Sequence, residues 1–321
     1  MLYLTRIHSQ PPAPGTGVRL AIYQNQGGPI GNAEAIAYYL AKMEEALQGA
    51  QRFEAQLISF AELYLTGYAL SPQEVHQLAI ARDGEVMTQV GQLAHKYQMA
   101  IICPYPEKAI INGEIHYYDS INLFDDQGKL VKTYRKTHLW GPDESKIYSR
   151  GHRHKEEGKA FTIHEVNGFP IGLLNCYEAE FAELTRILAL RGAKLVVIPT
   201  AADIWTLLST GERTKIPYPD VSHNVIPVRA LENHIFVAYC NRAGSETRLN
   251  AQGETVLVGE YLGNSAIAGP HGDLLLQPRN EETLLIADCV SADYGSLHPE
   301  QTNYLVDRQS NLYGSLASGL T

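Results

Sequence analysis

One cysteine of the chain, Cys176, occupies a position that suits a nucleophile. The apolar run from Pro170 to Leu174 predicts a buried strand that ends just before it, and a helical pattern begins at about Phe181. A side chain at such a strand-to-helix turn is exposed while its backbone is rigid. Backbone N–H groups after the turn, such as that of Tyr177, can stabilise an oxyanion. The alternative for an isolated cysteine is a small buried hydrophobe, which we favour for the three others, all within or ending apolar runs: Cys103, Cys240 and Cys289.

Three charged residues at predicted strand ends or in loops could assist this thiol, which needs a proton acceptor and a counter-charge. Glu62 follows the apolar run Gln56–Phe60, and a carboxylate in apolar surroundings suits a general base; the alternative is a structural ion pair. Lys136 ends a strand-like run and could hold that carboxylate and donate to an oxyanion, although alone it reads as a surface lysine. Glu144 lies eight residues further on, in a loop that could complete the site.

A second group of residues is predicted to line a substrate pocket. The candidates are Tyr68, Trp140, Tyr177, Glu178, Asp203 and Trp205. The aromatic members could equally belong to the core. The acidic members, together with Glu180, suggest an amine-bearing substrate, but Glu178 and Glu183 could instead be charges that stabilise a helix N-terminus.

Two histidines, His152 and His154, lie in the charged segment GHRHKEEGK. A metal site would need a third ligand at a suitable spacing, and none is apparent. We therefore favour a solvated loop over a metal site for this segment.

The composition excludes several classes of protein. The chain has 321 residues, 45% of them hydrophobic, and a net charge of −9. Such a charge disfavours binding to nucleic acids or to anionic membranes. The four cysteines include no CxxC pair, which favours reduced thiols in a cytoplasmic protein. We find no apolar run of about 18 residues and no signal-peptide pattern.

The order of predicted elements indicates a mixed α/β fold in one domain. Single strands are predicted at Val18–Tyr23, Gln56–Phe60, Met99–Cys103, Leu195–Pro199, Ile235–Cys240 and Leu284–Asp288. Hairpins are predicted at residues 117–134, 161–174 and 264–277, with turns at Asp125–Gly128, Asn167–Gly168 and Pro270–Asp273. Helices are predicted at Asn32–Gly49, with Asn32 as N-cap, and at Glu85–Tyr97, Ala182–Arg191 and Asn224–Asn233.

These elements imply a sheet, or two stacked sheets, with helices on the outer faces. We predict that residues 1–17 form a flexible lead-in because of their PPAPGTG stretch. Residues 18–290 form the domain, and residues 291–321 form a tail that packs on the domain or on a partner subunit.

Several segments together resemble the nitrilase (carbon–nitrogen hydrolase) superfamily, especially its small aliphatic amidases. FAELYLTGY resembles the glutamate motif, YRKTHLWGPDE the lysine motif, and GLLNCYEAEF the cysteine motif, all in the family's order. The ending DRQSNLYGSL is similar to the tails of those amidases. The resemblance covers about Val18 to Asp288.

The resemblance implies a four-layer α-β-β-α sandwich and a triad of Glu62, Lys136 and Cys176, with Glu144 as accessory glutamate. It implies hydrolysis of a small aliphatic carboxamide, no cofactor, and a homodimer or larger homo-oligomer. Two departures, Glu178 and Ala182 in place of the aspartate and proline of many amidases, leave the reaction open. Cleavage of N-carbamoyl compounds or nitriles by the same triad, and a non-catalytic scaffold, stay as alternatives.

Overall fold

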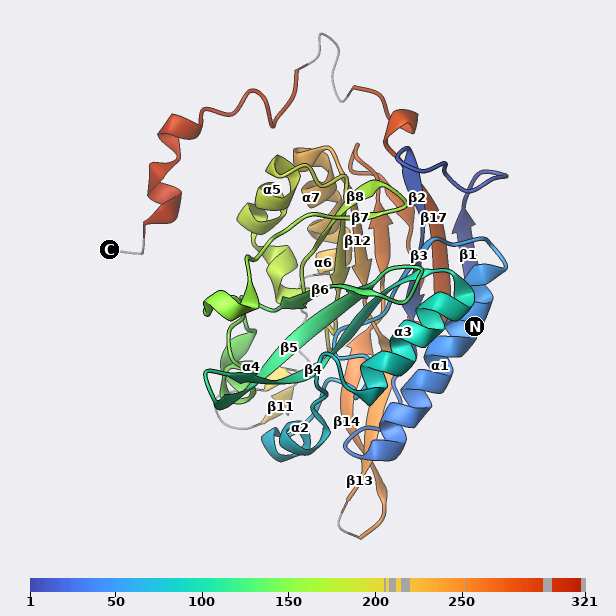
Figure 1. Ribbon diagram of the computed structural model, residues 1–321, viewed down its shortest axis with the longest axis vertical. Helices are drawn as coiled ribbons and strands as arrows, with labels where there is room; N and C mark the ends of the chain where they lie inside the picture. The colour runs from blue at the N-terminus through green and yellow to red at the C-terminus, as the bar shows by residue number, and fades with distance from the viewer. Residues whose placement is uncertain (205, 208–211, 215–219, 251, 297–301, 319–321) are drawn as a thin grey trace.

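Two large mixed sheets organise the protein in its computed structural model (Figure 1). The structure describes residues 1–204, 206–207, 212–214, 220–250, 252–296 and 302–318. The first sheet has the strand order β1-β17-β2-β3-β4-β5-β6 and the second β16-β15-β12-β9-β8-β7. Strands β2, β3 and β4 are parallel neighbours, as are β8, β9 and β12.

The strands are β1 (Leu2–Arg6), β2 (Gly17–Gln24), β3 (Leu57–Ser59), β4 (Ala100–Ile111), β5 (Glu114–Phe124), β6 (Leu130–Arg135), β7 (His164–Val166), β8 (Phe169–Leu173), β9 (Leu195–Pro199), β10 (Thr206–Leu207), β11 (Arg213–Thr214), β12 (Phe236–Cys240), β13 (Ala243–Leu249), β14 (Thr255–Leu262), β15 (Ala266–Ala268), β16 (Leu274–Leu276) and β17 (Thr283–Val290). The α-helices are α1 (Ala33–Gln51), α2 (Pro72–Leu78), α3 (Glu85–Tyr97), α4 (Gly141–Ile147), α5 (Ala182–Leu190), α6 (Val221–Asn224) and α7 (Ile226–Asn233), and a 3₁₀ helix, η2, spans Cys176–Glu180.

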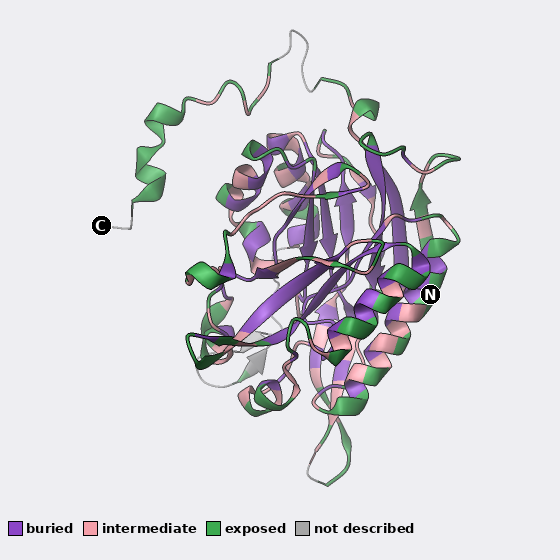
Figure 2. Cartoon of the chain, viewed as in Figure 1, coloured by how far each residue is buried: buried purple, intermediate pink, exposed green. Residues whose placement is uncertain are grey.

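The protein has four layers, helices–sheet–sheet–helices, because the central strands of each sheet are buried on both faces. In β2, Leu20 and Ile22 pack between the two sheets, whereas Ala21 and Tyr23 pack under α1 and α3. On the other side, the second sheet packs under α5 and α7 through side chains such as Val196. Because side chains alternate along a strand, continuously apolar strands fill both interfaces. The predicted α-β-β-α sandwich is confirmed, and Figure 2 shows its buried interior.

Most predicted elements are present. The three hairpins are β5–β6, β7–β8 and β15–β16, and the Asn32 side chain accepts from the Ala35 N–H at the start of α1. The helix predicted at Asn224–Asn233 is α7, which begins at Ile226, and the short helix α6 lies directly before it and ends at Asn224.

Several elements were missed, among them the short helix α4, which forms where a loop was predicted around Glu144. Residues 1–17 are not wholly a flexible lead-in, because Leu2–Arg6 forms β1 and pairs in parallel with β17. The prediction was wrong there because this strand depends on a partner almost at the other end of the chain. Helix α2 and the antiparallel hairpin β13–β14 were also missed; the hairpin contains many polar residues that conceal its strands.

The described part of the tail, residues 302–318, is mostly exposed. Leu305 contacts the core under α5 and α7, but Val306, Leu312 and Leu316 are 77%, 70% and 67% exposed. Packing of this tail on a partner subunit stays a prediction. In the part of the chain that is described, every helix is too short or too polar to cross a membrane.

We predict that the interface between the sheets dominates stability. Phe236 is fully buried there, so Phe236→Ala should lower the free energy of unfolding by about 3–5 kcal/mol, because the lost burial adds to the cost of a cavity. Urea denaturation measures it. Val228→Ala, at a side chain 46% exposed on α7, is the control and should change it by less than about 0.5 kcal/mol. Equal losses in the two variants would contradict this prediction.

Candidate active site

The residues predicted to act together meet at one end of the sandwich. Glu62 lies three residues after β3, Lys136 directly follows β6, and Cys176 lies three residues after β8. Glu144 comes from α4. Parallel strands bring their carboxyl ends to the same edge of a sheet, which is how segments distant in sequence converge.

Lys136 lies at the centre of this group. Its Nζ donates to Glu62 Oε1 at 2.6 Å and to Glu144 Oε1 at 2.8 Å, and it lies 3.4 Å from Asp119 Oδ2. The ammonium is fully buried. Burial by itself lowers the pKa of Lys136, but the charges of Glu144, Glu62 and Asp119 outweigh this effect and raise it. The lysine is therefore a permanent cation at neutral pH.

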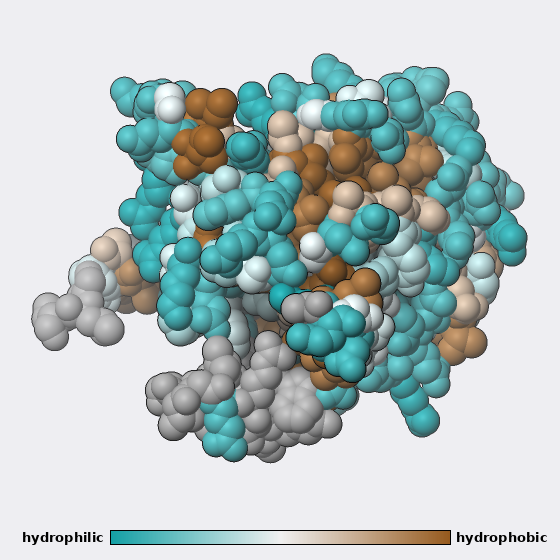
Figure 3. Space-filling model, turned by 90° about the horizontal axis from the view of Figure 1, so that it is seen from below, coloured by the Kyte–Doolittle hydropathy of each residue, from teal (hydrophilic) through white to brown (hydrophobic). Residues whose placement is uncertain are grey.

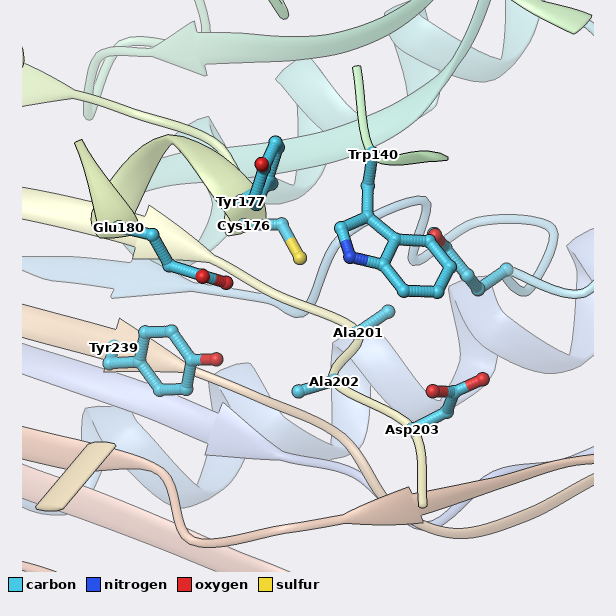
Figure 4. Close-up of a pocket in the computed structure, with 9 residues that line it drawn as sticks. Trp140, Cys176, Tyr177, Glu180, Ala201, Ala202, Asp203 and Tyr239 are labelled. Carbon is cyan, nitrogen blue, oxygen red and sulfur yellow. The ribbon is translucent and has the colours of Figure 1, made fainter. Parts of the chain in front are cut away.

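Cys176 begins η2 in a conformation that favours exposure of its side chain. Its φ is 49°, in the left-handed region that non-glycine residues rarely adopt, and the side chain points into a cavity beside Trp140 (Figure 4). Burial and the charge of Glu62 raise the pKa of the Cys176 thiol, whereas Lys136 and the Ala201 N–H oppose that shift. The resting sulfur is therefore a thiol, and ionisation requires a nearby base.

A small cavity of about 30 Å³ surrounds the sulfur. It is lined by Tyr68, Trp140, Cys176, Tyr177, Glu180, Ala201, Ala202, Asp203 and Tyr239 (Figure 4). Four of the six predicted pocket residues are among them. Ala201, Ala202 and Tyr239 were not among the predicted pocket residues. Ala201 and Ala202 closely follow β9, and this position after a buried strand was the available signal.

The two remaining candidates do not line this cavity. Glu178 is fully buried, and its carboxylate accepts from Tyr134 Oη at 2.8 Å, Thr137 N at 2.7 Å and Asn175 N at 2.8 Å. Burial alone would raise the pKa of Glu178, but these and neighbouring donors outweigh it and lower it. The prediction that Glu178 contacts substrate was wrong, because η2 turns it toward the β6 end. Trp205 lies outside the described residues.

A second cavity, of about 380 Å³, adjoins the first and shares Tyr68, Trp140 and Asp203 with it. It lies between α2, α4 and β14, at the end of the molecule seen in Figure 3, where apolar side chains are visible among hydrophilic ones. Trp140 also donates its backbone N–H to Glu144 Oε2 at 2.7 Å, and Tyr68 Oη donates to Glu144 Oε1 at 2.7 Å. Two residues that line both cavities, Tyr68 and Trp140, are thus hydrogen-bonded to Glu144, which itself accepts from Lys136.

A buried ion pair between Arg242 and Glu246, which was not predicted from the sequence, contacts the loop that carries Glu62. Arg242 donates to Glu246 and to the backbone oxygen of Glu62. Glu246 also accepts from the N–H groups of Tyr68 at 2.8 Å and Ala69 at 2.9 Å. This pair therefore fixes the segment that carries the predicted base.

The two histidines of the charged loop have structural contacts. His152 Nε2 accepts from the Arg135 N–H at 3.3 Å, and the His154 N–H donates to Glu157 at 2.9 Å. Among the described residues, the only side-chain group close enough to hold a metal ion is Glu62, Asp119 and Glu144. The ammonium of Lys136 already lies among those three carboxylates.

The fold and this cysteine-centred site are those of a carbon–nitrogen hydrolase. A profile of the Carbon-nitrogen hydrolase family matches residues 19–299, and the chain belongs to that family. The chain is 32% identical over 300 residues to the "hydrolase in pqqF 5′ region" of Pseudomonas protegens, covering 94% of this chain and 92% of the relative. It is 28% identical over 261 residues to an (R)-stereoselective amidase of a Pseudomonas species, covering 81% and 82%.

The solved structures point to the same branch of the family. An amidase from Nesterenkonia sp. superposes with a TM-score of 0.72 at 26% identity, covering 93% of this chain and 96% of that one. The resemblance to the nitrilase superfamily is therefore confirmed, as are its mixed sheets and its placement beside small aliphatic amidases.

We predict that Cys176 is the thiol that iodoacetamide modifies first in the folded protein, because Cys103, Cys240 and Cys289 are fully buried. Its raised pKa means that the rate increases as pH rises and more thiolate forms. Since the charge of Glu62 contributes to that shift, Glu62→Gln should move the rate profile to lower pH. Mass spectrometry of the labelled cysteines measures both effects. A Glu62→Gln profile displaced to higher pH would contradict this prediction.

Proposed function

We propose that the protein hydrolyses a short carboxamide, R–CO–NH₂, to a carboxylic acid and ammonia through a thioester on Cys176. The single observation that supports this most strongly is the buried contact of Lys136 with Glu62 and Glu144 beside the Cys176 thiol. The Nesterenkonia amidase is similar over nearly its whole length, and mutants of it have been solved in complex with acrylamide and with butyramide. A mutant of it carries the acetamide moiety of fluoroacetamide on its active-site cysteine.

The arrangement suits acyl transfer in two stages. Glu62 takes the proton from Cys176 Sγ as the sulfur attacks the amide carbon. The Lys136 ammonium and the Tyr177 N–H stabilise the tetrahedral oxyanion. Glu62 then returns the proton to the amide nitrogen, the C–N bond breaks, and ammonia leaves.

Water completes the cycle at the same residues. Glu62 takes a proton from a water molecule, and the oxygen of that water attacks the thioester carbon. The C–S bond then breaks as Glu62 passes the proton to sulfur, which restores the thiol and releases the carboxylic acid. Glu144 holds the ammonium of Lys136 in place throughout, because its Oε1 accepts from Nζ at 2.8 Å.

We predict that Cys176→Ala loses essentially all ammonia release while the fold persists, since a methyl group cannot form the thioester. The measurement is ammonia release from a panel of short amides, N-carbamoyl compounds and nitriles. Circular dichroism of the variant checks the fold, and Cys289→Ala, at a buried cysteine outside the site, is the matched control. Turnover retained by Cys176→Ala would refute the nucleophile. A wild type that acts only on nitriles or N-carbamoyl compounds would redirect the assignment to those reactions.

We further propose that the preferred amide carries an amine, as in 5-aminopentanamide or an amino-acid amide. Among the described residues that line the cavity around the sulfur, two are acidic, Glu180 and Asp203, and none is basic. Acidic side chains at a cavity attract a cation and repel an anion.

This preference predicts that Glu180→Gln lowers kcat/KM for a cationic amide by roughly two- to fivefold, the size expected of one exposed charge. Hydrolysis of a neutral amide of equal length should change little, because the neutral substrate does not interact with that charge. Steady-state rates on cationic, neutral and anionic amides, at low and at high salt, provide the measurement. A wild type that prefers anionic amides would contradict the proposal.

A further inference from the structure

A third buried acid, Asp119, contacts the site, although it lies within the apolar strand β5. Its Oδ1 accepts from the side-chain amide of Asn175 at 2.9 Å, and its Oδ2 lies 3.4 Å from Lys136 Nζ. Its backbone oxygen accepts from the Lys136 N–H at 2.9 Å. Asp119 is fully buried, and it therefore connects the lysine to the residue that precedes Cys176.

The charges around Asp119 do not balance if every acid is ionised. Carboxylate oxygens of Glu62, Asp119 and Glu144 all lie within 4.8 Å of one another, and Lys136 is the cation among them. Three negative charges against one positive charge in a buried space are costly. Two adjacent carboxylates in such surroundings commonly share a proton.

Two unsatisfied oxygens indicate where that proton lies. Glu62 Oε2 and Asp119 Oδ2 are both buried, and neither has a hydrogen-bond partner. Since buried polar atoms are almost always paired, a proton on one carboxyl that is donated to the other would satisfy both atoms at once.

We propose that Asp119 is protonated in the resting enzyme and donates a hydrogen bond through Oδ2 to Glu62 Oε2, as a positioning residue for the base. The inference rests on the proposed function and deepens it. Glu62 and Glu144 then stay ionised beside Lys136. During thiol activation the S–H bond of Cys176 breaks and an O–H bond forms at Glu62, while the proton of Asp119 remains on Asp119.

The electrostatics agree with this geometry. Burial and the charge of Glu62 raise the pKa of Asp119 well above its usual range, and Lys136 only partly opposes the shift. The ionisable groups that interact with it are Glu62 after β3, Lys136 after β6, and Glu144 and Tyr148 at α4. Because its raised pKa keeps the carboxyl neutral, the bond to Glu62 is present below that pKa and is lost as pH rises through it.

The first test is the pH profile of Asp119→Asn. The asparagine amide keeps an acceptor for Asn175 and a donor for Glu62, but it cannot ionise. We expect kcat/KM, relative to its own maximum, to extend to higher pH than in the wild type. A role of Asp119 only as an anion paired with Lys136 predicts lower activity with an unchanged profile, and that outcome would overturn the inference. Asp126→Asn, at an exposed turn residue, is the matched control and should leave the profile unaltered.

The second test does not need activity. Infrared spectra of the wild type should contain the carbonyl stretch of a protonated carboxylic acid at neutral pH. Labelling with ¹³C-aspartate should shift that band, and Asp119→Asn should remove it. No such band, or a band that shifts only with ¹³C-glutamate, would overturn the inference. A wild type that shows the aspartate band yet hydrolyses no amide would refute the proposed function alone.

Discussion

The structure depends on the complete burial of one ammonium ion, that of Lys136. An isolated charge in such surroundings is too costly to persist, and the protein satisfies it with carboxylates from β5, from the loop after β3 and from α4. Without the acids, the buried lysine would lose its proton and become neutral. Without the lysine, the ionised acids would repel one another. Together they form a polar cluster beside the sulfur of Cys176, and the net charge of this cluster changes when any one of the acids gains or loses a proton.

The positions of most strands along the chain, and the meeting of Glu62 and Lys136 near Cys176, were predictable because each depends on local pattern. Glu62, Lys136 and Cys176 interrupt or end apolar runs, and the ends of parallel strands converge. Asp119 was not predictable, since it lies inside the run YYDSINLF and matters only because β5 pairs with β6. Arg242 and Glu246 depend in the same way on a contact with the Glu62 loop, about 180 positions earlier in the chain.

Glu178 illustrates a different limit. Its type and its nearness to Cys176 are compatible with contact to substrate, and only the turn of η2 decides which way it points. With Cys176 at a φ of 49°, the chain reverses, and the carboxylate meets Tyr134 and Thr137 at the end of β6. Sequence patterns indicate which residues lie near one another along a strand or a helix. They do not indicate in which direction a side chain points after an irregular turn.

The bonds of Glu178 join the two halves of the sandwich, because Tyr134 belongs to the seven-stranded sheet and η2 follows β8 of the six-stranded one. Asn175 and Asp119 make a second such link. Apolar faces alone tolerate many ways of stacking, since the hydrophobic effect has no direction, whereas these polar contacts are satisfied in one alignment. The residues beside Cys176 therefore also specify how one sheet lies on the other, and a chain with its sheets displaced by one residue would lose both these contacts and the arrangement of the proposed active site.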